Sequence, residues 1–195
     1  MTRVGSIGRK TNETSIELKW YLEDKKGFIG TTGIGFLDHM MTLFAKHSGT
    51  TIECDGKGDL EVDTHHLVED LGICLGLCLL EALGDKKGIE RYGAFTCPMD
   101  ETLTQVNIDL SGRGYYVGNF ELKREKLGDF ETEMLWEFLY AFAINGKMNL
   151  HVNVLYGMND HHIAESIFKA LGRALKEAVK ADENNDEIPS TKGVL

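Results

Sequence analysis

The chain has 195 residues, of which 42% are hydrophobic, so it can bury a substantial core as one large domain or two small ones. Its 21 lysines and arginines against 31 aspartates and glutamates give a net charge of −10, which disfavours nucleic acid and anionic membranes as partners. The chain start lacks the apolar core of a signal peptide, and no apolar run reaches membrane-spanning length. The spacing of the four cysteines is not that of a disulfide framework. We therefore expect no membrane association and a cytoplasmic location.

Hydrophobic patterns predict the elements of the first half in chain order. Alternating apolar residues predict strands over residues 3–9, 16–22, 28–32, 50–54 and 59–62. A turn is expected at residues 11–14 and a hairpin-like turn at residues 25–27. Helical spacing predicts one helix over residues 36–46 and a second, more apolar helix that runs to about Gly84.

The second half repeats this order of elements. Strands are expected over residues 103–110, 115–120 and 149–156, and helices from about 131 to 144 and up to about 181. Arg91-Tyr92-Gly93 followed by Glu101-Thr102 mirrors Arg3-Val4-Gly5 followed by Glu13-Thr14. We therefore expect an α+β fold with an internal duplication, in which two similar sheet-plus-helix halves are related by a pseudo-two-fold axis. The halves would span residues 1–86 and 87–181, and residues 182–195 would form a C-terminal tail.

A His-His-x-x-Glu block occurs at the start of the last helix of each half. Asp63-Thr64-His65-His66-Leu67-Val68-Glu69 returns as Asn159-Asp160-His161-His162-Ile163-Ala164-Glu165, with a constant offset of 96 residues. Asp63 or Thr64, and Asn159 or Asp160, are suitable N-cap residues directly before the histidines. Both blocks are therefore expected in the first turns of helices.

Helix geometry limits what each block can bind. Residues four apart share a helix face, so His65 and Glu69 can converge on one ion, as can His161 and Glu165. Neighbouring histidines point about 100° apart and would serve different ions. Ligands that point in two directions suit a site with two metals. The alternative of solvated histidines at polar helix starts is weakened because the block occurs twice in register.

Nitrogen and carboxylate ligands without a thiolate suit Mn, Fe, Co, Ni or Zn, and the carboxylate content favours Mn(II). His39, near the start of the first predicted helix, is a further candidate ligand, and its counterpart in the second half lies near Glu137. Taken singly, His39 reads as an ordinary helix-face histidine and Glu137 as a solvated carboxylate. Two six-coordinate ions would leave positions open for substrate and water, as catalysis requires.

A second group of residues suits an anion. Arg91, Arg113 and Lys192 lie beside small residues, where backbone and cation can approach a phosphate closely. His47 could join such a site but is equally consistent with a loop residue. Taken singly, each of these residues could be ordinary surface charge.

Several motifs, in the same order along essentially the whole chain, resemble one family, imidazoleglycerol-phosphate dehydratase. They are the Arg-x-Gly start with Asn-Glu-Thr at 12–14, Gly-Phe-Leu-Asp-His-Met, the two histidine blocks, Ser-Gly-Arg and the terminal Pro-Ser-Thr-Lys-Gly-Val-Leu. The resemblance implies a duplicated α+β fold, two manganese ions per active site and an assembly of 24 subunits with active sites between subunits. Glu137 departs from the family pattern, because many members have histidine at this position.

The resemblance also implies a carbon–oxygen lyase of histidine biosynthesis, which dehydrates imidazole glycerol phosphate to imidazole acetol phosphate through an imidazolate bound by two manganese ions. The implied metal ligands are His39, His65, His66, Glu69, Glu137, His161, His162 and Glu165. Glu13 is the candidate acid or base, with His66, Glu69 and Glu165 as further catalytic residues. The implied substrate contacts are Glu13, His39, His47, His65, Glu69, Arg91, Arg113, His161, Ser190 and Lys192. A metal-bound hydroxide or a ligand carboxylate could equally abstract the proton.

Two other functions fit the histidine blocks. A two-metal hydrolase would use paired ions to activate water on a phosphate ester, although no aspartate-rich hydrolase motif is present. A metal-storage assembly would bury its ions, but it would not need the anion-binding residues. A zinc protease is excluded because the His-Glu-x-x-His order is absent.

Overall fold

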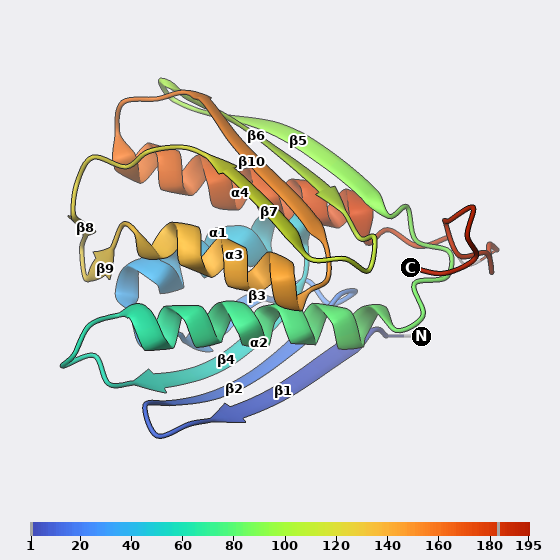
Figure 1. The fold of residues 1–195 in the computed structure, drawn as a ribbon, viewed down its shortest axis with the longest axis horizontal. Helices are drawn as coiled ribbons and strands as arrows, with labels where there is room; N and C mark the ends of the chain where they lie inside the picture. The colour runs from blue at the N-terminus through green and yellow to red at the C-terminus, as the bar shows by residue number, and fades with distance from the viewer. Residues whose placement is uncertain (1, 183) are drawn as a thin grey trace.

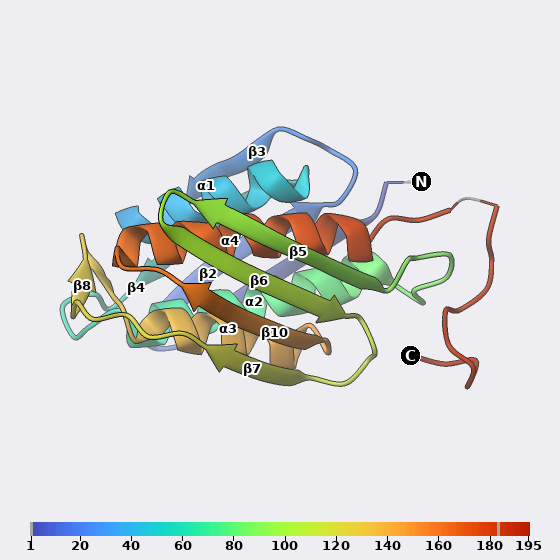
Figure 2. The same cartoon turned by 90° about the horizontal axis from the view of Figure 1, so that it is seen from above.

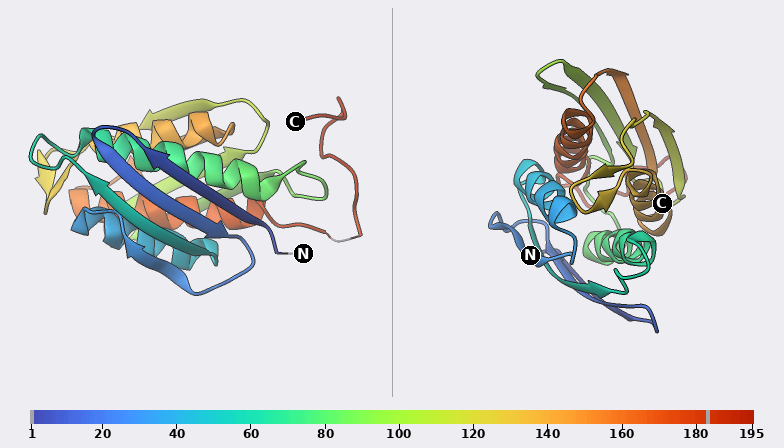
Figure 3. Two further views of the ribbon diagram at one scale, coloured as in Figure 1. Left: turned by 90° about the horizontal axis from the view of Figure 1, so that it is seen from below. Right: turned by 90° about the vertical axis from the view of Figure 1, so that its left-hand side faces the viewer.

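A computed structural model describes residues 2–182 and 184–195, and it has four layers with two sheets outside and helices between them (Figures 1 and 3). The first half contributes one sheet and the helices that cover it, and the second half contributes the other sheet with its own helices. Each half places its helices on one face of its sheet, and the two helical layers meet in the middle. The expected α+β fold of two sheet-plus-helix halves is confirmed.

The first half contains the strands β1 (Val4–Lys10), β2 (Thr14–Tyr21), β3 (Gly27–Thr31) and β4 (Thr51–Gly58), and the helices α1 (Gly35–Ser48) and α2 (His65–Leu83). The strand order in its sheet is β1-β2-β4-β3, with β3 parallel to β4 and the other pairs antiparallel. Buried residues alternate along β2 because one sheet face packs on the helices and the other faces outward.

The second half contains β5 (Tyr92–Met99), β6 (Thr102–Asp109), β7 (Tyr115–Asn119), β8 (Lys126–Leu127), β9 (Phe130–Glu131) and β10 (Asn149–Tyr156), with the helices α3 (Met134–Asn145) and α4 (Asp160–Ala178). Its four-stranded sheet has the order β5-β6-β10-β7, with β7 parallel to β10. This is the strand order of the first half, and Figure 2 shows this sheet from above with α4 beneath it. The short β8–β9 hairpin is an addition to the second half.

The two halves pack in a pseudo-symmetric way. Helix α1 packs on α4, and its counterpart α3 packs on α2. A Cβ atom added to Gly172 of α4 would lie 2.7 Å from the carbonyl oxygen of Phe44, and one added to Gly76 of α2 would lie 2.8 Å from that of Phe142. The equivalent rings of Phe44 and Phe142 touch each other, with 6.2 Å between ring centroids, and both pack against Trp20 in the core. Glycine is therefore required at both helix crossings because the backbones nearly touch there.

Four details of the predicted elements are wrong. Residues 59–62 form a turn, closed by the Val62 N–H that donates to the Asp59 carbonyl at 2.8 Å, and not a strand. The turn at residues 25–27 leads into a strand parallel to β4, so it makes no hairpin with β2. Helix α3 starts at Met134 because the residues before it form β9, and α4 ends at Ala178. None of the described helices has both the length and the apolar character that crossing a membrane requires.

Candidate functional site

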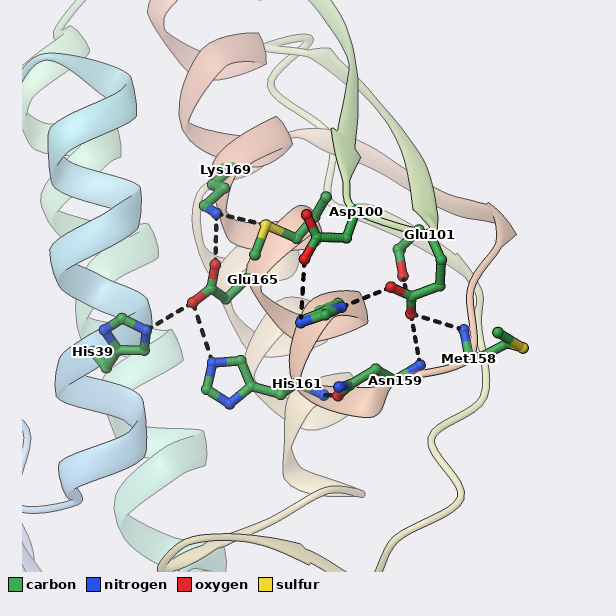
Figure 4. Close-up of polar contacts among 11 residues, drawn as sticks. His39, Asp100, Glu101, Met158, Asn159, His161, Glu165 and Lys169 are labelled. Carbon is green, nitrogen blue, oxygen red and sulfur yellow. Dashed lines mark hydrogen bonds and ion pairs between the residues drawn. The ribbon is translucent and has the colours of Figure 1, made fainter.

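Three candidate ligands from both halves of the chain meet between α1 and α4 (Figure 4). The Glu165 Oε1 atom lies 2.9 Å from His39 Nε2 and 3.1 Å from His161 Nε2. One donor atom from each of these three residues lies within 4.8 Å of the others. Among residues 2–182 and 184–195, this is the only group of three or more histidine, cysteine, aspartate or glutamate side chains with such spacing.

The local sequence explains this arrangement. Asn159 caps α4 by accepting a hydrogen bond from the His161 N–H at 3.0 Å, so the histidine block begins in the first helical turn as predicted. Four-residue spacing then places His161 and Glu165 on one helix face. Helix α1 brings His39 to the same face because Gly172 lets the two helices approach closely.

Lys169 completes this cluster as an internal counter-ion. Its Nζ donates to Glu165 Oε2 at 2.5 Å, one turn further along α4. Burial alone would raise the pKa of Glu165, but hydrogen bonds from Lys169, His39 and His161 outweigh burial and lower this pKa to about 2. The carboxylate is therefore ionised at neutral pH and able to bind a cation. Lys169 was missed by the sequence reasoning, although its position four residues after Glu165 on the helix was a usable signal.

The first histidine block is more open. His65 Nε2 and Glu69 Oε2 are 3.9 Å apart, and both side chains are nearly half exposed. Phe44 of α1 and Phe142 of α3 occupy equivalent positions, because the backbone of each lies against a glycine of the helix it packs on. The same difference in residue number relates His39 of α1 to Glu137 of α3. Glu137 therefore occupies the position expected from the sequence, near the start of a helix packed on α2. Between residues 2 and 182, no hydrogen bond or ion pair joins it to the first block.

The second histidine of each block faces a carboxylate other than the glutamate of its own block. This agrees with the expectation that neighbouring side chains of a helix point in different directions. His66 Nδ1 lies 3.0 Å from Asp59 and 3.9 Å from Glu13. His162 Nδ1 lies 2.7 Å from Glu101, which also accepts the Asn159 N–H at 2.8 Å. A carboxylate at Nδ1 orients the imidazole and leaves Nε2 free for a metal.

The contact between His162 and Glu101 also shifts the pKa of both residues. The hydrogen bond from His162 is the main cause that lowers the pKa of Glu101 to about 2, and the same bond raises the pKa of His162. Asp59 and Glu101 were not among the sequence-based candidates. The signal for Glu101 was present, because Glu101-Thr102 repeats Glu13-Thr14.

The donor set fits a divalent transition-metal ion such as Mn, Fe, Co, Ni or Zn. His39, His161 and Glu165 offer two imidazole nitrogens and a carboxylate at distances that a small shift would bring onto one cation. His65 and Glu69 offer the same chemistry in a wider arrangement. The two blocks lie on different helices and form separate clusters within one chain.

The candidate anion-binding residues meet at the other end of the fold. Arg91, Arg113, Ser190 and Lys192 line one hollow of about 440 Å³, together with other residues of the tail. Asp109 holds Arg91 through contacts of 2.7 and 3.2 Å, and Arg91 Nη1 donates to the Pro189 carbonyl at 2.8 Å. Arg91 therefore ties the tail to the fold while it faces the hollow.

His47 does not line this hollow. It lies in the last turn of α1, and burial is the main cause that lowers its pKa, followed by the charges of Lys169, Arg173 and Lys46. Helix α4 separates the two candidate sites, because the Arg91 N–H donates to Ala178 at the C-terminal end of α4 and His161 lies at its start. The 17 residue-to-residue steps from His161 to Ala178 span roughly 25 Å along the α helix. One small substrate cannot reach both sites of the same chain.

Comparison with known proteins identifies what the chain resembles. Residues 32–175 match the family described as Imidazoleglycerol-phosphate dehydratase. The enzyme of that name from Oceanobacillus iheyensis is 52% identical over 193 residues, covering 99% of this chain and 100% of the relative, and that from Listeria monocytogenes is 54% identical with the same coverage. The crystal structure of the Staphylococcus aureus enzyme matches with a TM-score of 0.83 and 41% identity, covering 92% of this chain and 99% of that one. The Pyrococcus furiosus structure matches with a TM-score of 0.83 and 39% identity, covering 97% and 100%.

Proposed function

The chain belongs to the imidazoleglycerol-phosphate dehydratase family of carbon–oxygen lyases in histidine biosynthesis, and from this premise we propose that it dehydrates imidazole glycerol phosphate to imidazole acetol phosphate with two manganese ions per active site. The observation that carries the metal dependence is the convergence of His39, His161 and Glu165, in which both imidazole Nε2 atoms face one carboxylate oxygen.

The proposed ligands form groups according to the helix face on which each side chain lies. His39, His161 and Glu165 would hold one ion, and His65, Glu69 and Glu137 the equivalent one. His66 and His162 point away from these groups and would complete coordination at a neighbouring cluster. Metal ions held by these residues would supply Lewis-acid chemistry that favours loss of a proton from the substrate's imidazole ring and so assists departure of the hydroxyl from the adjacent carbon.

Residues of the chain would orient the substrate and move its protons. Glu13 lies in the turn between β1 and β2, with Oε2 3.9 Å from His66 Nδ1 and an exposed side chain that can reach a bound ligand. We assign to Glu13 the role of acid or base toward the glycerol part. Glu101 and Asp59 would keep His162 and His66 in the tautomer that has Nε2 unprotonated.

Arg91, Arg113, Ser190 and Lys192 would bind the phosphate, and His47 would contribute from α1. Because the hollow and the histidine clusters lie at opposite ends of α4, each active site would combine the clusters of one chain with the hollow of another. This supports self-association with sites between subunits, for which we propose the 24-subunit assembly. Exposed aromatic side chains on the outer sheet face, including Tyr92, Tyr115 and Tyr156, are available to such contacts.

We also place the protein in the cytoplasm. Its cysteines are buried and unpaired, and burial raises the pKa of Cys74 and Cys78 to about 12, so their thiols stay protonated. Unpaired thiols are usual in a reducing compartment.

A single assay tests the proposed reaction. The protein is incubated with imidazole glycerol phosphate and Mn(II), and the ketone imidazole acetol phosphate is followed together with inorganic phosphate. We expect the ketone without phosphate release. Phosphate release without the ketone would instead identify a two-metal hydrolase, and binding of Mn(II) without turnover would identify a storage protein.

A further inference from the structure

One segment of the second half contacts the starts of three helices that carry candidate ligands. Residues 32–34 connect β3 to α1, whereas residues 120–133, with β8 and β9, connect β7 to α3. We name residues 120–133 the clamp segment. We propose that the clamp segment is a positioning element that fixes the first turns of α1, α2 and α4 relative to one another and holds the ligand side chains near coordinating distance before a metal binds. This inference rests on the proposed metal dependence.

The clamp segment caps α1 from a distance in sequence. Ile34, the N-cap residue of α1, provides no side-chain cap. Instead, Asp129 accepts the Gly35 N–H at 2.7 Å and the Phe36 N–H at 3.0 Å. A carboxylate at this position satisfies otherwise unpaired N–H groups and opposes the helix dipole. His39 follows one turn later, so Asp129 fixes the turn that aims this ligand.

The clamp segment also holds the start of α2. Thr64, the N-cap residue, makes no cap hydrogen bond to its own helix, and its N–H donates to Glu131 at 3.1 Å. The Thr64 hydroxyl donates to the same carboxylate oxygen. Lys126 pairs with the other oxygen of Glu131 at 2.9 Å. The residue immediately after Thr64 is His65, so Glu131 fixes the position at which the first histidine block begins.

The third attachment is to α4. Asp160 is the first residue of α4 and is buried, and its Oδ2 accepts the N–H groups of Lys123 at 3.0 Å and Arg124 at 2.7 Å. The Thr132 N–H donates to the Glu125 carbonyl at 3.0 Å, which closes the clamp segment into a compact loop. The segment therefore joins the second histidine block to the two helices of the first half.

An aromatic contact extends this attachment to a ligand side chain. The buried Phe130 of β9 packs on Phe36, with 5.7 Å between ring centroids. Phe36 in turn meets the ring of His161 edge to face at 5.4 Å. The position of His161 thus depends on the clamp segment both through the start of α4 and through this aromatic stack.

Such attachments matter because the ligands come from separate elements. His39 belongs to the first half, and His161 and Glu165 to the second, so no local chain constraint sets their spacing. Metal sites tolerate errors of only about 0.5 Å in ligand position. A shared anchor at three helix starts supplies that accuracy without contributing a ligand of its own.

The test compares D129A with E133Q, which changes an exposed carboxylate of the same segment, and with I108V, which truncates a core side chain of β6 away from the segment. Amide hydrogen exchange is measured in the metal-free full chain, and Mn(II) affinity is measured by the EPR signal of free Mn(II). In D129A we expect exchange of the amides of residues 35–39 to accelerate at least about tenfold and the Kd for Mn(II) to rise about tenfold. D129N, which keeps one acceptor oxygen, should lie between D129A and the wild type.

E133Q and I108V should leave both quantities within twofold of the wild type, which separates positioning from a general loss of stability. Unchanged exchange in D129A, or faster exchange with an unchanged Kd, would overturn the proposal. A wild-type protein without saturable Mn(II) binding would instead refute the proposed metal dependence, so the two failures are distinguishable.

Discussion

Replacement of Gly172 by alanine tests whether the crossing of α1 and α4 sets the spacing of the ligands. The added methyl group would lie 2.7 Å from the Phe44 carbonyl oxygen and 2.9 Å from the Ser48 nitrogen. Both contacts are with backbone atoms, which cannot rotate away. Ordinary van der Waals contact begins at 3.4 Å, so the helices must separate by about 0.7 Å.

Two opposing terms determine the effect of G172A on stability. Overpacking of this kind costs about 1–3 kcal/mol. Alanine is favoured over glycine in a helix by about 1 kcal/mol, which offsets part of that cost. We therefore expect a net loss of about 0–2 kcal/mol in the free energy of unfolding. The same displacement would stretch the 2.9 Å contact of His39 with Glu165 beyond hydrogen-bonding range, and we expect Mn(II) affinity to fall about tenfold.

Urea denaturation of the metal-free protein and Mn(II) titration provide the two measurements for G172A. K46A, at an exposed position of α1, serves as the control and should change neither quantity. If G172A were more stable than the wild type and bound Mn(II) equally well, only the helix-propensity term would be acting. The close approach of the helices, and the argument that it spaces the ligands, would then be wrong.

Three further predictions concern the site directly. H66A should lower kcat/KM for imidazole glycerol phosphate by at least about a hundredfold, whereas H151A, in the middle of β10, should retain activity; equal activity of both variants would remove His66 from the site. K192A should raise KM with little change in kcat because it removes substrate binding alone, and steady-state kinetics with an unchanged KM would remove Lys192 from the phosphate site. Chelation should abolish activity and shrink the assembly in analytical ultracentrifugation, with both restored by Mn(II); full activity after exhaustive metal removal would contradict the proposed role of the ions.

The sequence predicted the features that depend on local periodicity. The repeat of the histidine block at a fixed offset placed both blocks in first helical turns, and four-residue spacing predicted the contact of His161 with Glu165. The strand of residues 149–156 was predicted to the residue, because Leu150, Val152 and Val154 alternate with polar residues before the register shifts near its end. The order strands, helix, strand, helix in both halves followed from the same patterns, although no strand was predicted over residues 92–99, which form β5.

Features that depend on contacts between distant segments were not predicted. The turn at residues 59–62 resembles a strand in its pattern, but Asp59 is used to hold His66 and the chain must turn there to begin α2. The clamp segment has only two short strands, and its anchors, Asp129 and Glu131, act on helices about 70 to 90 residues earlier in the chain. Sequence spacing within one element carries no information about such partners.

The difference between the two clusters follows from one substitution between the halves. His39 meets Glu165 on one side of the pseudo-two-fold axis, and on the other side the equivalent position, in the first turn of α3 packed on α2, is occupied by Glu137. An imidazole can hydrogen-bond a carboxylate, but two carboxylates repel each other unless a cation lies between them. This accounts for the close contacts of Glu165 with His39 and His161 and for the wider spacing of His65 and Glu69.

Glu137 is thus expected to be a ligand whose contribution is seen only when the metal is present. E137A should leave the stability of the metal-free protein within about 0.5 kcal/mol of the wild type, because the residue is partly exposed. The same variant should weaken Mn(II) binding about tenfold or more, while E137H, which supplies an imidazole ligand, should retain affinity. Urea denaturation and Mn(II) titration measure the two effects separately. Unchanged Mn(II) affinity in E137A would mean that the second ion is held without Glu137. The explanation of the wide spacing of His65 and Glu69 by the negative charge of Glu137 would then be wrong.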